Sequence, residues 1–352
     1  MHCGHKLQNS YELQELVNKI SYDPLTSFPI LTAKIKLTWR CNLKCSFCSV
    51  WQKPAIEIPK ERVMDTLSYL HKNGLEKIHF SGGEIFLYPY YKEVISYARE
   101  LDLQVNITTN GTLIDKEIAR FLVNQRVHTV AISMDSPRKK IHNLIRGKNA
   151  FERTMKGINY LLQRKATKGR GPKIAINTVI TKSLIDDIDL MYTTLKELGI
   201  NSWVLLPIDS DNKKDLPDAE QWQFIADKIP KRGDLISRLP IDLSSERSCQ
   251  RAAKGKYAGV FYPENRCYAP WFNVFIDADG KTYPCCMGKG EMIPYGNINQ
   301  TSIKQLLVSK YHDEILLSFS SGYMYPVCER CDDFLEENRI FNQLINTDNE
   351  AK

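Results

Sequence analysis

Six short runs typical of β-strands alternate with helical segments along the first two thirds of the chain. This alternation limits the possible folds more than any other feature of the sequence. The runs are rich in β-branched residues and cover 33–39, 77–80, 104–110, 128–135, 173–181 and 202–208. Helices between consecutive strands act as crossover connections, which place the strands parallel. The pattern therefore predicts a parallel α/β sheet, either open or curled into a partial barrel.

Apolar residues at helical spacing locate several connecting helices. One helix is predicted around Val63–Leu70, and Gly74 is placed to end it. Others are predicted around Ile118–Leu122 and over Leu184–Leu198, and a later one over Ser302–Phe319.

The alternation ends after Ile208, and the rest of the chain has a different organisation. The run "NVFIDADGKTYPCC" predicts a hairpin around an Asp279–Gly280 turn. The chain has 352 residues, 43% of them apolar, which is enough for a large domain and a smaller one. We expect an N-terminal extension over 1–33, a core domain over 34–245, a small α+β domain over 246–340 and a tail over 341–352.

Three cysteines lie within eight residues, with the spacing C-x3-C-x2-C: Cys41, Cys45 and Cys48. Three thiolates can hold three irons of a cubane 4Fe–4S cluster and leave the fourth iron open to a reactant. The alternative is a structural zinc ion with a remote fourth ligand.

Polar or glycine-containing segments follow the next three predicted strands, which argues against a simple zinc site. They are "SGGE" at 81–84, "TTNG" at 108–111 and "ISMDS" at 132–136. Because the carboxyl ends of parallel strands meet at one face of the sheet, these segments should converge near the cysteine loop.

Together, these motifs resemble the signature of the radical S-adenosylmethionine (SAM) superfamily over roughly residues 34–335. The cysteine loop carries an aromatic residue, Phe47, before its last cysteine, and "GGE" follows the second strand, as in that family. The resemblance implies a partial (β/α)6 TIM-like barrel in which SAM completes the coordination of the cluster. It also implies reductive cleavage of SAM to a 5′-deoxyadenosyl radical that abstracts hydrogen from a substrate carbon.

The resemblance also implies SAM contacts, each with an ordinary structural alternative. Gly82, Gly83 and Glu84 would receive the methionine ammonium, although a Gly-Gly pair alone is typical of a tight turn. Phe47 would lie near the adenine, or pack in the core. Arg146 would hold the SAM carboxylate, or form a surface salt bridge.

Three further residues at strand ends are expected to contact SAM, with strand-end capping as the alternative. They are Thr109, Asn110 and Ser133. No general base can be chosen from the sequence.

A second set of cysteines resembles the SPASM and twitch extensions of radical SAM enzymes, which carry auxiliary 4Fe–4S clusters. Twelve residues separate Cys267 from Gly280, four more precede Cys285, and Cys328 and Cys331 follow as C-x2-C. The resemblance implies one auxiliary cluster held by these four cysteines, and zinc is the alternative. Cys249 and Cys286 are interpreted as small buried apolar residues.

Three functions are compatible with the sequence. The spacing of the second set is most similar to that of the butirosin-pathway dehydrogenase, which favours oxidation of a sugar or aminocyclitol with the auxiliary cluster as electron acceptor. The alternatives are modification of a ribosomal peptide by thioether or carbon–carbon crosslinking, and a non-catalytic metal-binding protein. Either enzyme would need an external electron donor such as flavodoxin or ferredoxin.

Charge and hydropathy exclude other classes. A net charge of +7 and a pI of about 8.7 are lower than a dedicated nucleic-acid-binding domain requires, so nucleic acid is an unlikely partner. The sequence contains no long apolar run and no signal peptide, so we expect no membrane partner and a cytoplasmic location. Ten cysteines in such a chain point to reduced thiols and metal binding.

Overall fold

The computed structural model describes residues 18–20, 22–26, 29–208, 213–228, 233–239, 241–258, 261–262, 265–332 and 338–343. The predicted N-terminal extension and tail are therefore described only in part. The division into domains stays a prediction.

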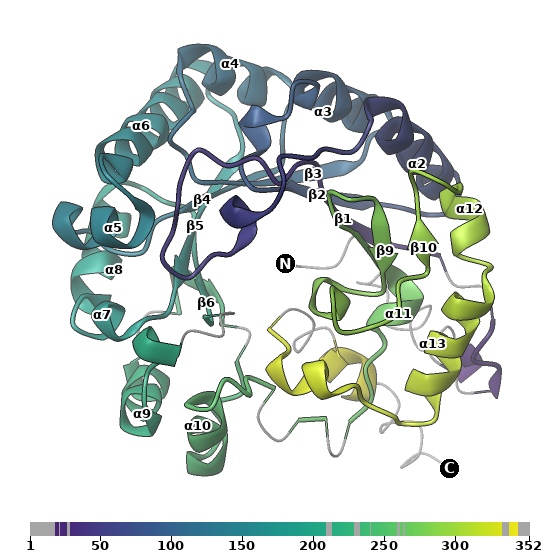
Figure 1. Ribbon diagram of the computed structural model, residues 1–352. Coiled ribbons are helices and arrows are strands. Elements are labelled where there is room, and N and C mark those ends of the chain that lie inside the picture. The colour runs from purple at the N-terminus through teal and green to yellow at the C-terminus, as the bar shows by residue number, and fades with distance from the viewer. Residues whose placement is uncertain are drawn as a thin grey trace.

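The described strands form one curved ten-stranded sheet in the order β10-β9-β8-β1-β2-β3-β4-β5-β6-β7 (Figure 1). The strands are β1 Thr32–Lys36, β2 Lys77–Ser81, β3 Gln104–Thr109, β4 Thr129–Ser133, β5 Lys173–Val179, β6 Ser202–Leu206, β7 Ile236–Arg238, β8 Asn273–Ile276, β9 Lys281–Tyr283 and β10 Gly296–Asn297. From β8 to β7, all neighbours are parallel, and β9 and β10 pair antiparallel. The six predicted strands and their parallel order are confirmed, whereas β7 was not predicted.

Helices cover the outer side of the sheet (Figure 1). The α-helices are α2 Lys60–Lys72, α3 Tyr91–Glu100, α4 Lys116–Asn124, α5 Lys139–Arg146, α6 Ala150–Lys168, α7 Lys182–Ile185, α8 Ile188–Glu197, α9 Ala219–Lys228, α10 Glu246–Ala252, α11 Ala269–Phe272, α12 Ile303–Leu306 and α13 Lys310–Ser320. Short 3₁₀ helices are η2 Val50–Gln52, η3 Ile85–Leu87, η4 Lys213–Asp215, η6 Cys286–Gly288 and η7 Pro326–Arg330.

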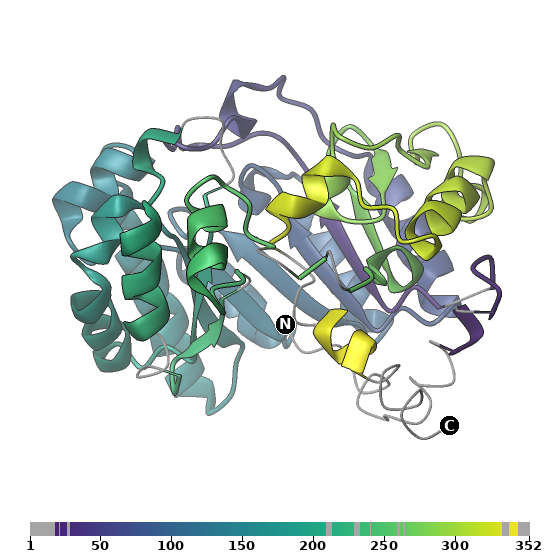
Figure 2. The same ribbon diagram turned by 90° about the horizontal axis from the view of Figure 1, so that it is seen from below.

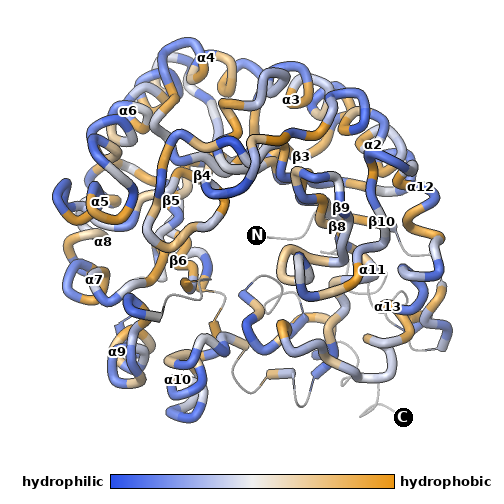
Figure 3. The backbone as a smooth tube through the Cα atoms, in the orientation of Figure 1, coloured by the Kyte–Doolittle hydropathy of each residue, from blue (hydrophilic) through white to orange (hydrophobic). Residues whose placement is uncertain are grey.

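The main core lies between the sheet and these helices. Ala33 and Ile35 on β1 are buried, as are Val63 and Leu67 on α2, and Lys34, between Ala33 and Ile35, points to the other face of the sheet. Figure 3 shows the same division, with hydrophilic colour on the outer surfaces of the helices and hydrophobic colour toward the sheet. The helices end as predicted where local signals are strong, since Gly74 follows α2 with a φ of +100°.

Two predicted helices are each interrupted in the structure. The helix predicted over Leu184–Leu198 is broken at Asp187, whose buried carboxylate accepts a hydrogen bond from Ser136 at 2.8 Å and pairs with Arg138 at 2.8 Å. The helix predicted over 302–319 is broken before Ser309, whose hydroxyl caps the first turn of α13. The Ser309 side chain starts α13, whereas the Asp187 carboxylate makes no cap to α8 and binds Ser136 and Arg138 instead.

The C-terminal segment continues the same sheet. The predicted hairpin is confirmed as β8 and β9 around Gly280, whose φ is +85°. Strand β8 pairs in parallel with β1, and the Thr32 hydroxyl donates to the Asn273 side chain at 2.8 Å. Figure 2 shows β1, in purple, between the blue strands of the first half and the green strands of the second.

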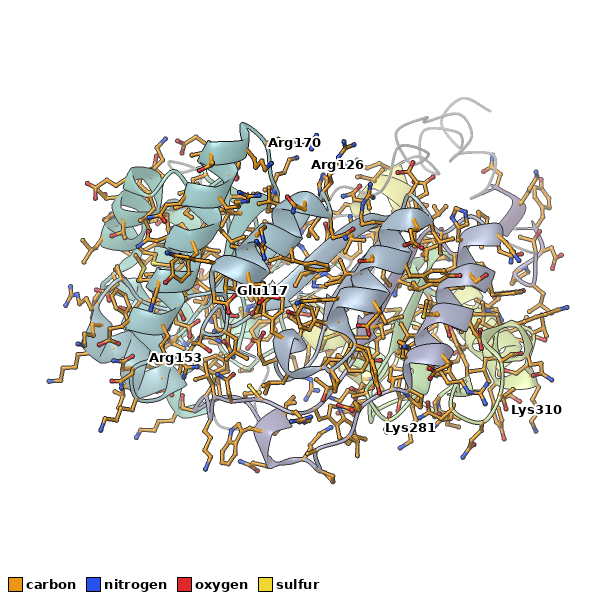
Figure 4. The ribbon with its side chains drawn as sticks, turned by 90° about the horizontal axis from the view of Figure 1, so that it is seen from above. Glu117, Arg126, Arg153, Arg170, Lys281 and Lys310 are labelled. Atoms are coloured by element: carbon orange, nitrogen blue, oxygen red, sulfur yellow. The ribbon has the colours of Figure 1, made fainter. Side chains whose placement is uncertain are left out.

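Figure 4 distinguishes the two ends of the strands. Arg126 and Arg170 precede β4 and β5 and lie at one end, whereas Arg153 and Lys281 lie toward the other. The second end is therefore the carboxyl end, where the predicted site residues should meet. In the described part of the chain, no helix is long and apolar enough to span a membrane.

Replacing Gly157 by alanine should destabilise the fold. In an open helix this change would stabilise by about 1 kcal/mol. Here the new Cβ would overlap the Gly111 carbonyl oxygen and lie 3.1 Å from the Ile114 Cβ. Overpacking costs about 1–3 kcal/mol, so this cost should exceed the gain in helix propensity. Urea denaturation of the metal-free protein measures the change, with the exposed neighbour Lys156→Ala as control. An unfolding midpoint at or above that of the wild type would show that α6 can move away from the segment between β3 and α4.

Candidate functional site

The cysteine loop leaves the sheet after β1 and is closed at its base by a short antiparallel pairing. The Trp39 amide donates to the Ile56 carbonyl, and the Ile58 amide donates to the Leu37 carbonyl, both at 3.0 Å. The loop lies across the carboxyl ends of the strands (Figure 1). Two backbone clamps therefore hold a segment that would otherwise be a long unsupported loop.

Hydrogen bonds inside the loop bring its cysteines into one compact turn. The Cys48 amide donates to the Cys45 carbonyl at 3.1 Å, and the Trp51 indole donates to the same oxygen at 3.3 Å. The Ser46 amide donates to the Ile145 carbonyl at 2.9 Å, which fastens the loop to the end of α5. Cys45 packs with Leu43 and with Ala150 at the start of α6, and Cys41 and Cys48 pack against this group.

The "GGE" segment binds the base of the loop. The Gly83 amide donates to the Thr38 carbonyl at 2.7 Å, and the Glu84 amide donates to the Arg40 carbonyl at 2.8 Å. A Cβ on Gly82 would lie 2.7 Å from the Thr38 oxygen, and one on Gly83 would overlap the Arg40 oxygen. Both glycines are therefore required by close backbone contact with the loop, in addition to any contact with SAM.

Glu84 is buried and joins β3 to the same place. Its carboxylate accepts the Thr109 hydroxyl and the Asn110 amide, both at 2.7 Å, and the Phe86 amide at 3.3 Å. Burial raises the pKa of Glu84, and these three donors oppose that rise. Glu84 thus has a structural role that sequence reasoning missed, and its predicted contact with the methionine ammonium stays a prediction.

The Asn110 side chain contacts the cysteine loop directly. It donates to the Asn42 side chain at 2.9 Å and accepts the Thr112 amide at 2.9 Å. Asn42 directly follows Cys41, so this network positions the first cysteine from the end of β3. Asn42 and Thr112 were not singled out from the sequence, because their role depends on contacts more than 60 residues apart.

Arg146 and Asp135 form a buried ion pair behind Cys45. The guanidinium contacts the carboxylate through two nitrogens, at 2.6 and 3.0 Å, and its third nitrogen lies 3.9 Å from the Cys45 sulfur. Burial lowers the pKa of Arg146, but Asp135 raises it further, so the net shift is upward. The surface salt bridge that was the alternative for Arg146 is wrong, because the pair lies in the interior. Contact with the SAM carboxylate stays a prediction.

The other predicted SAM contacts lie around this pair. The Phe47 ring lies 5.5 Å from the Arg146 guanidinium, measured to its centroid. Ser133 ends β4, half-buried and opposite Asn177, and the buried Thr109 ends β3. The structure therefore gathers the predicted residues at one end of the sheet around the cysteine loop.

Burial disfavours the thiolate forms of Cys41 and Cys45. It raises the pKa of Cys45 to about 11, against the opposing effect of Arg146, and it also raises the pKa of Cys41. Metal ligands must be thiolates, so ligation here releases protons. Three sulfurs on one firmly held loop fit a cluster that leaves one iron to another ligand.

The second set of cysteines also comes together. Cys285 is half-buried, and desolvation together with the charges of Cys331, Cys267 and Cys328 raises its pKa. Within the described residues, no group of three or more histidine, cysteine, aspartate and glutamate side chains is arranged to hold one metal ion.

Polar side chains line this second site. The Tyr262 hydroxyl donates to the Cys331 sulfur at 3.6 Å, and Asn338 donates to the Cys267 sulfur at 3.3 Å and to Tyr262 at 3.1 Å. Such donors stabilise sulfur ligands and tune cluster potentials. Neither Tyr262 nor Asn338 stands out in the sequence, because neither belongs to a cysteine motif.

The two remaining described cysteines differ from each other. Cys249 is buried on α10, and its thiol contacts Gln223 at 3.6 Å, as the buried interpretation predicts. Cys286 is half-buried and packs against the core, and its charge affects the pKa of Lys36, so the buried interpretation holds for it only in part.

Family comparisons agree with this geometry. The family profile of the radical SAM superfamily matches residues 35–180, and that of an iron–sulfur cluster-binding domain, SPASM, matches residues 267–332. The chain belongs to the radical SAM superfamily and carries a SPASM domain. It is a radical SAM enzyme whose cofactors are 4Fe–4S clusters and SAM.

Particular relatives share most of the chain. It is 29% identical over 345 residues to the antilisterial bacteriocin subtilosin biosynthesis protein AlbA of Bacillus subtilis. The alignment covers 92% of this chain and 71% of AlbA. It is 25% identical over 279 residues to mycofactocin maturase MftC of Mycolicibacterium smegmatis. This alignment covers 76% of this chain and 68% of MftC. The fold is similar to that of Streptococcus suis SuiB bound to precursor peptide SuiA, with a TM-score of 0.65 and 20% identity. The superposition covers 94% of this chain and 76% of the SuiB chain.

Replacing Gly83 by alanine should displace the cysteine loop and prevent assembly of the first cluster. After anaerobic reconstitution, iron should fall from about eight to about four atoms per chain. Ser49→Ala on the exposed side of the same loop is the matched control and should retain the wild-type iron content. Full iron content in Gly83→Ala would mean that the loop does not depend on this backbone contact.

Replacing Asp135 by asparagine should leave the Arg146 charge buried and unpaired. We expect a loss of about 3–5 kcal/mol in the free energy of unfolding, measured with urea on the metal-free protein. Glu117→Gln removes the exposed partner of Lys92, at 2.5 Å, and should change little. Equal effects of the two substitutions would contradict a structural role for the buried pair.

Proposed function

We propose that this enzyme modifies a peptide by removing hydrogen from one of its carbon atoms, with SAM as the radical source. The similarity to AlbA supports this proposal most, because it runs through nearly the whole chain, the cysteine loop and the SPASM segment included. AlbA is named for the biosynthesis of a bacteriocin, and MftC is named as a maturase. Oxidation of a sugar or aminocyclitol, favoured by the cysteine spacing alone, has weaker support.

The residues around the first cluster have separate tasks in this proposal. When bound, the reduced cluster and SAM provide a one-electron route for removing hydrogen from an unactivated carbon. Glu84 and Asn110 hold the cysteine loop against β2 and β3, and Arg146 with Asp135 supports it from α5. The Phe47 ring beside Arg146 supplies an apolar surface that excludes water from the site.

The second cysteine set would take the electron that the substrate loses. Four cysteines leave no open position for substrate, so a relay suits that site better than substrate binding. The hydroxyl of Tyr262 and the amide of Asn338 provide hydrogen bonds to its sulfurs. An external flavodoxin or ferredoxin is proposed as the source of the first electron.

Replacing Cys41, Cys45 and Cys48 together by alanine should lower reconstituted iron from about eight to about four atoms per chain. Dithionite-driven release of 5′-deoxyadenosine should disappear, because the remaining cluster cannot bind SAM. Iron analysis and liquid chromatography measure the two outcomes, and Cys249→Ala is the matched control. Release that persists in the triple variant would exclude this loop as the site of SAM cleavage.

The peptide substrate is tested separately. Synthetic peptides encoded by genes beside this one should lose hydrogen when incubated with the reconstituted enzyme, SAM and dithionite, and mass spectrometry detects the change. If sugars or aminocyclitols are oxidised and no peptide is changed, the peptide proposal is wrong.

A further inference from the structure

Three lysines meet around one buried carboxylate between the cysteine loop and the β8–β9 hairpin. Lys36 ends β1, Lys53 follows η2, and Lys289 follows η6. The carboxylate is that of Asp277, which directly follows β8 and is 3% exposed. None of these residues belongs to a cysteine motif.

Both oxygens of the Asp277 carboxylate already have partners. One of its oxygens accepts the Trp39 indole and the Ala278 amide, both at 2.8 Å. The other oxygen lies 3.6 Å from the Lys289 ammonium. The carboxylate can therefore neutralise one of the three lysines and has little capacity for the others.

Lys36 and Lys53 each lie beside an aromatic ring, and the Lys53 side chain also contacts that of Lys289. The Lys36 ammonium lies 5.6 Å from the centroid of the Phe275 ring, and that of Lys53 lies 4.3 Å from the Trp39 ring. Neither lysine forms an ion pair with a described residue. Both are half-buried, so each ammonium has lost water without gaining a carboxylate.

The charges of this lysine cluster do not balance. Three ammonium groups against the Asp277 carboxylate leave a formal charge of +2, since the nearby Asp279 is paired with Lys281. Burial and the charge of Lys289 lower the pKa of both Lys36 and Lys53. Despite its own burial, the pKa of Asp277 is lowered by Lys36 and Lys289. An anion placed among the three ammonium groups would relieve their repulsion.

The lysine cluster lies near Cys48 of the first cysteine set and near Cys286, which adjoins the second. Lys36 is close enough to Cys48 of the first set and to Cys286, beside Cys285 of the second, for their charges to affect its pKa. A substrate that loses hydrogen near the first cluster and an electron to the second must occupy the region between them. An anionic group bound here would belong to that substrate.

We propose that Lys36, Lys53 and Lys289 bind a carboxylate of the peptide substrate, carried near the carbon that loses hydrogen. This inference rests on the proposed peptide function and adds a substrate class to it: a peptide with an acidic residue at the reacting segment. Lysines suit this task as point charges that accept a carboxylate in several orientations. Lys289 is also held in place by Asp277.

Binding tests the proposal without turnover. The reconstituted holoenzyme with SAM is titrated anaerobically with two blocked pentapeptides, which are identical except for glutamate or glutamine at the centre. We expect the glutamate peptide to bind at least about tenfold more tightly by calorimetry, since hydrogen bonds to charged groups are worth that much. Lys36→Gln and Lys289→Gln should each remove the preference. Equal affinities, or no binding of either peptide, overturn the proposal.

Lys281→Gln is the matched control. Lys281 lies on the same hairpin, is exposed, and pairs with Asp279 at 3.3 Å, so its loss should leave the preference unchanged (Figure 4). Iron content and thermal unfolding of each variant show whether it folds and retains both clusters. Variants that lose iron but keep the glutamate preference would identify the lysines as counter-charges for the clusters, which overturns the proposal.

Inorganic phosphate is the second probe. If phosphate displaces the glutamate peptide at equal concentration, the site binds small anions in general and the proposal fails. Failure of the peptide function has a different signature: the glutamate peptide binds through the lysines, but no peptide changes mass. The reverse result, a peptide modified regardless of acidic residues and of Lys36, overturns the carboxylate site alone.

Discussion

Close backbone contact between Gly82–Gly83 and Thr38–Arg40 is the constraint on which the first site depends. It presses the end of β2 against the base of the cysteine loop without any side chain between them. Glu84 then extends from this contact to β3 and fixes Thr109 and Asn110 through its buried carboxylate. One three-residue motif therefore joins two strand ends and the loop, and the positions of the cysteines follow from that junction.

The opposite side of the loop is held by charge rather than by backbone contact. Asp135 follows β4, accepts the Val179 amide at 3.0 Å, and holds Arg146 at the end of α5. The same guanidinium reaches the Cys45 sulfur and lies beside Phe47. Because a buried ion pair is costly to break, Asp135 and Arg146 stay together. The ends of β4 and β5 therefore fix the position of the cysteine loop through this pair.

The sequence predicts features that depend on neighbours along the chain. Strand β2 and the Asp279–Gly280 turn are predicted well, because periodicity and turn chemistry are local. The structural hydrogen bonds of Glu84 and Asn110 could not be predicted, because their partners lie on other segments of the chain and become neighbours only when the sheet forms. The pairing of β8 with β1 joins residues 241 positions apart and has no local signal.

That pairing determines how the two cysteine sets are related. Strand β1 leads into the cysteine loop at its carboxyl end and pairs on one side with β2 and on the other with β8. Strand β8 leads through the hairpin and β9 to Cys285, so one sheet carries the first cysteine loop after β1 and Cys285 after β9. The closeness of Lys36 and Asp277 follows from this arrangement, because they lie at the carboxyl ends of two paired strands. A rigid sheet between the sets also fixes the space that a substrate can occupy, so specificity must come from side chains at these strand ends.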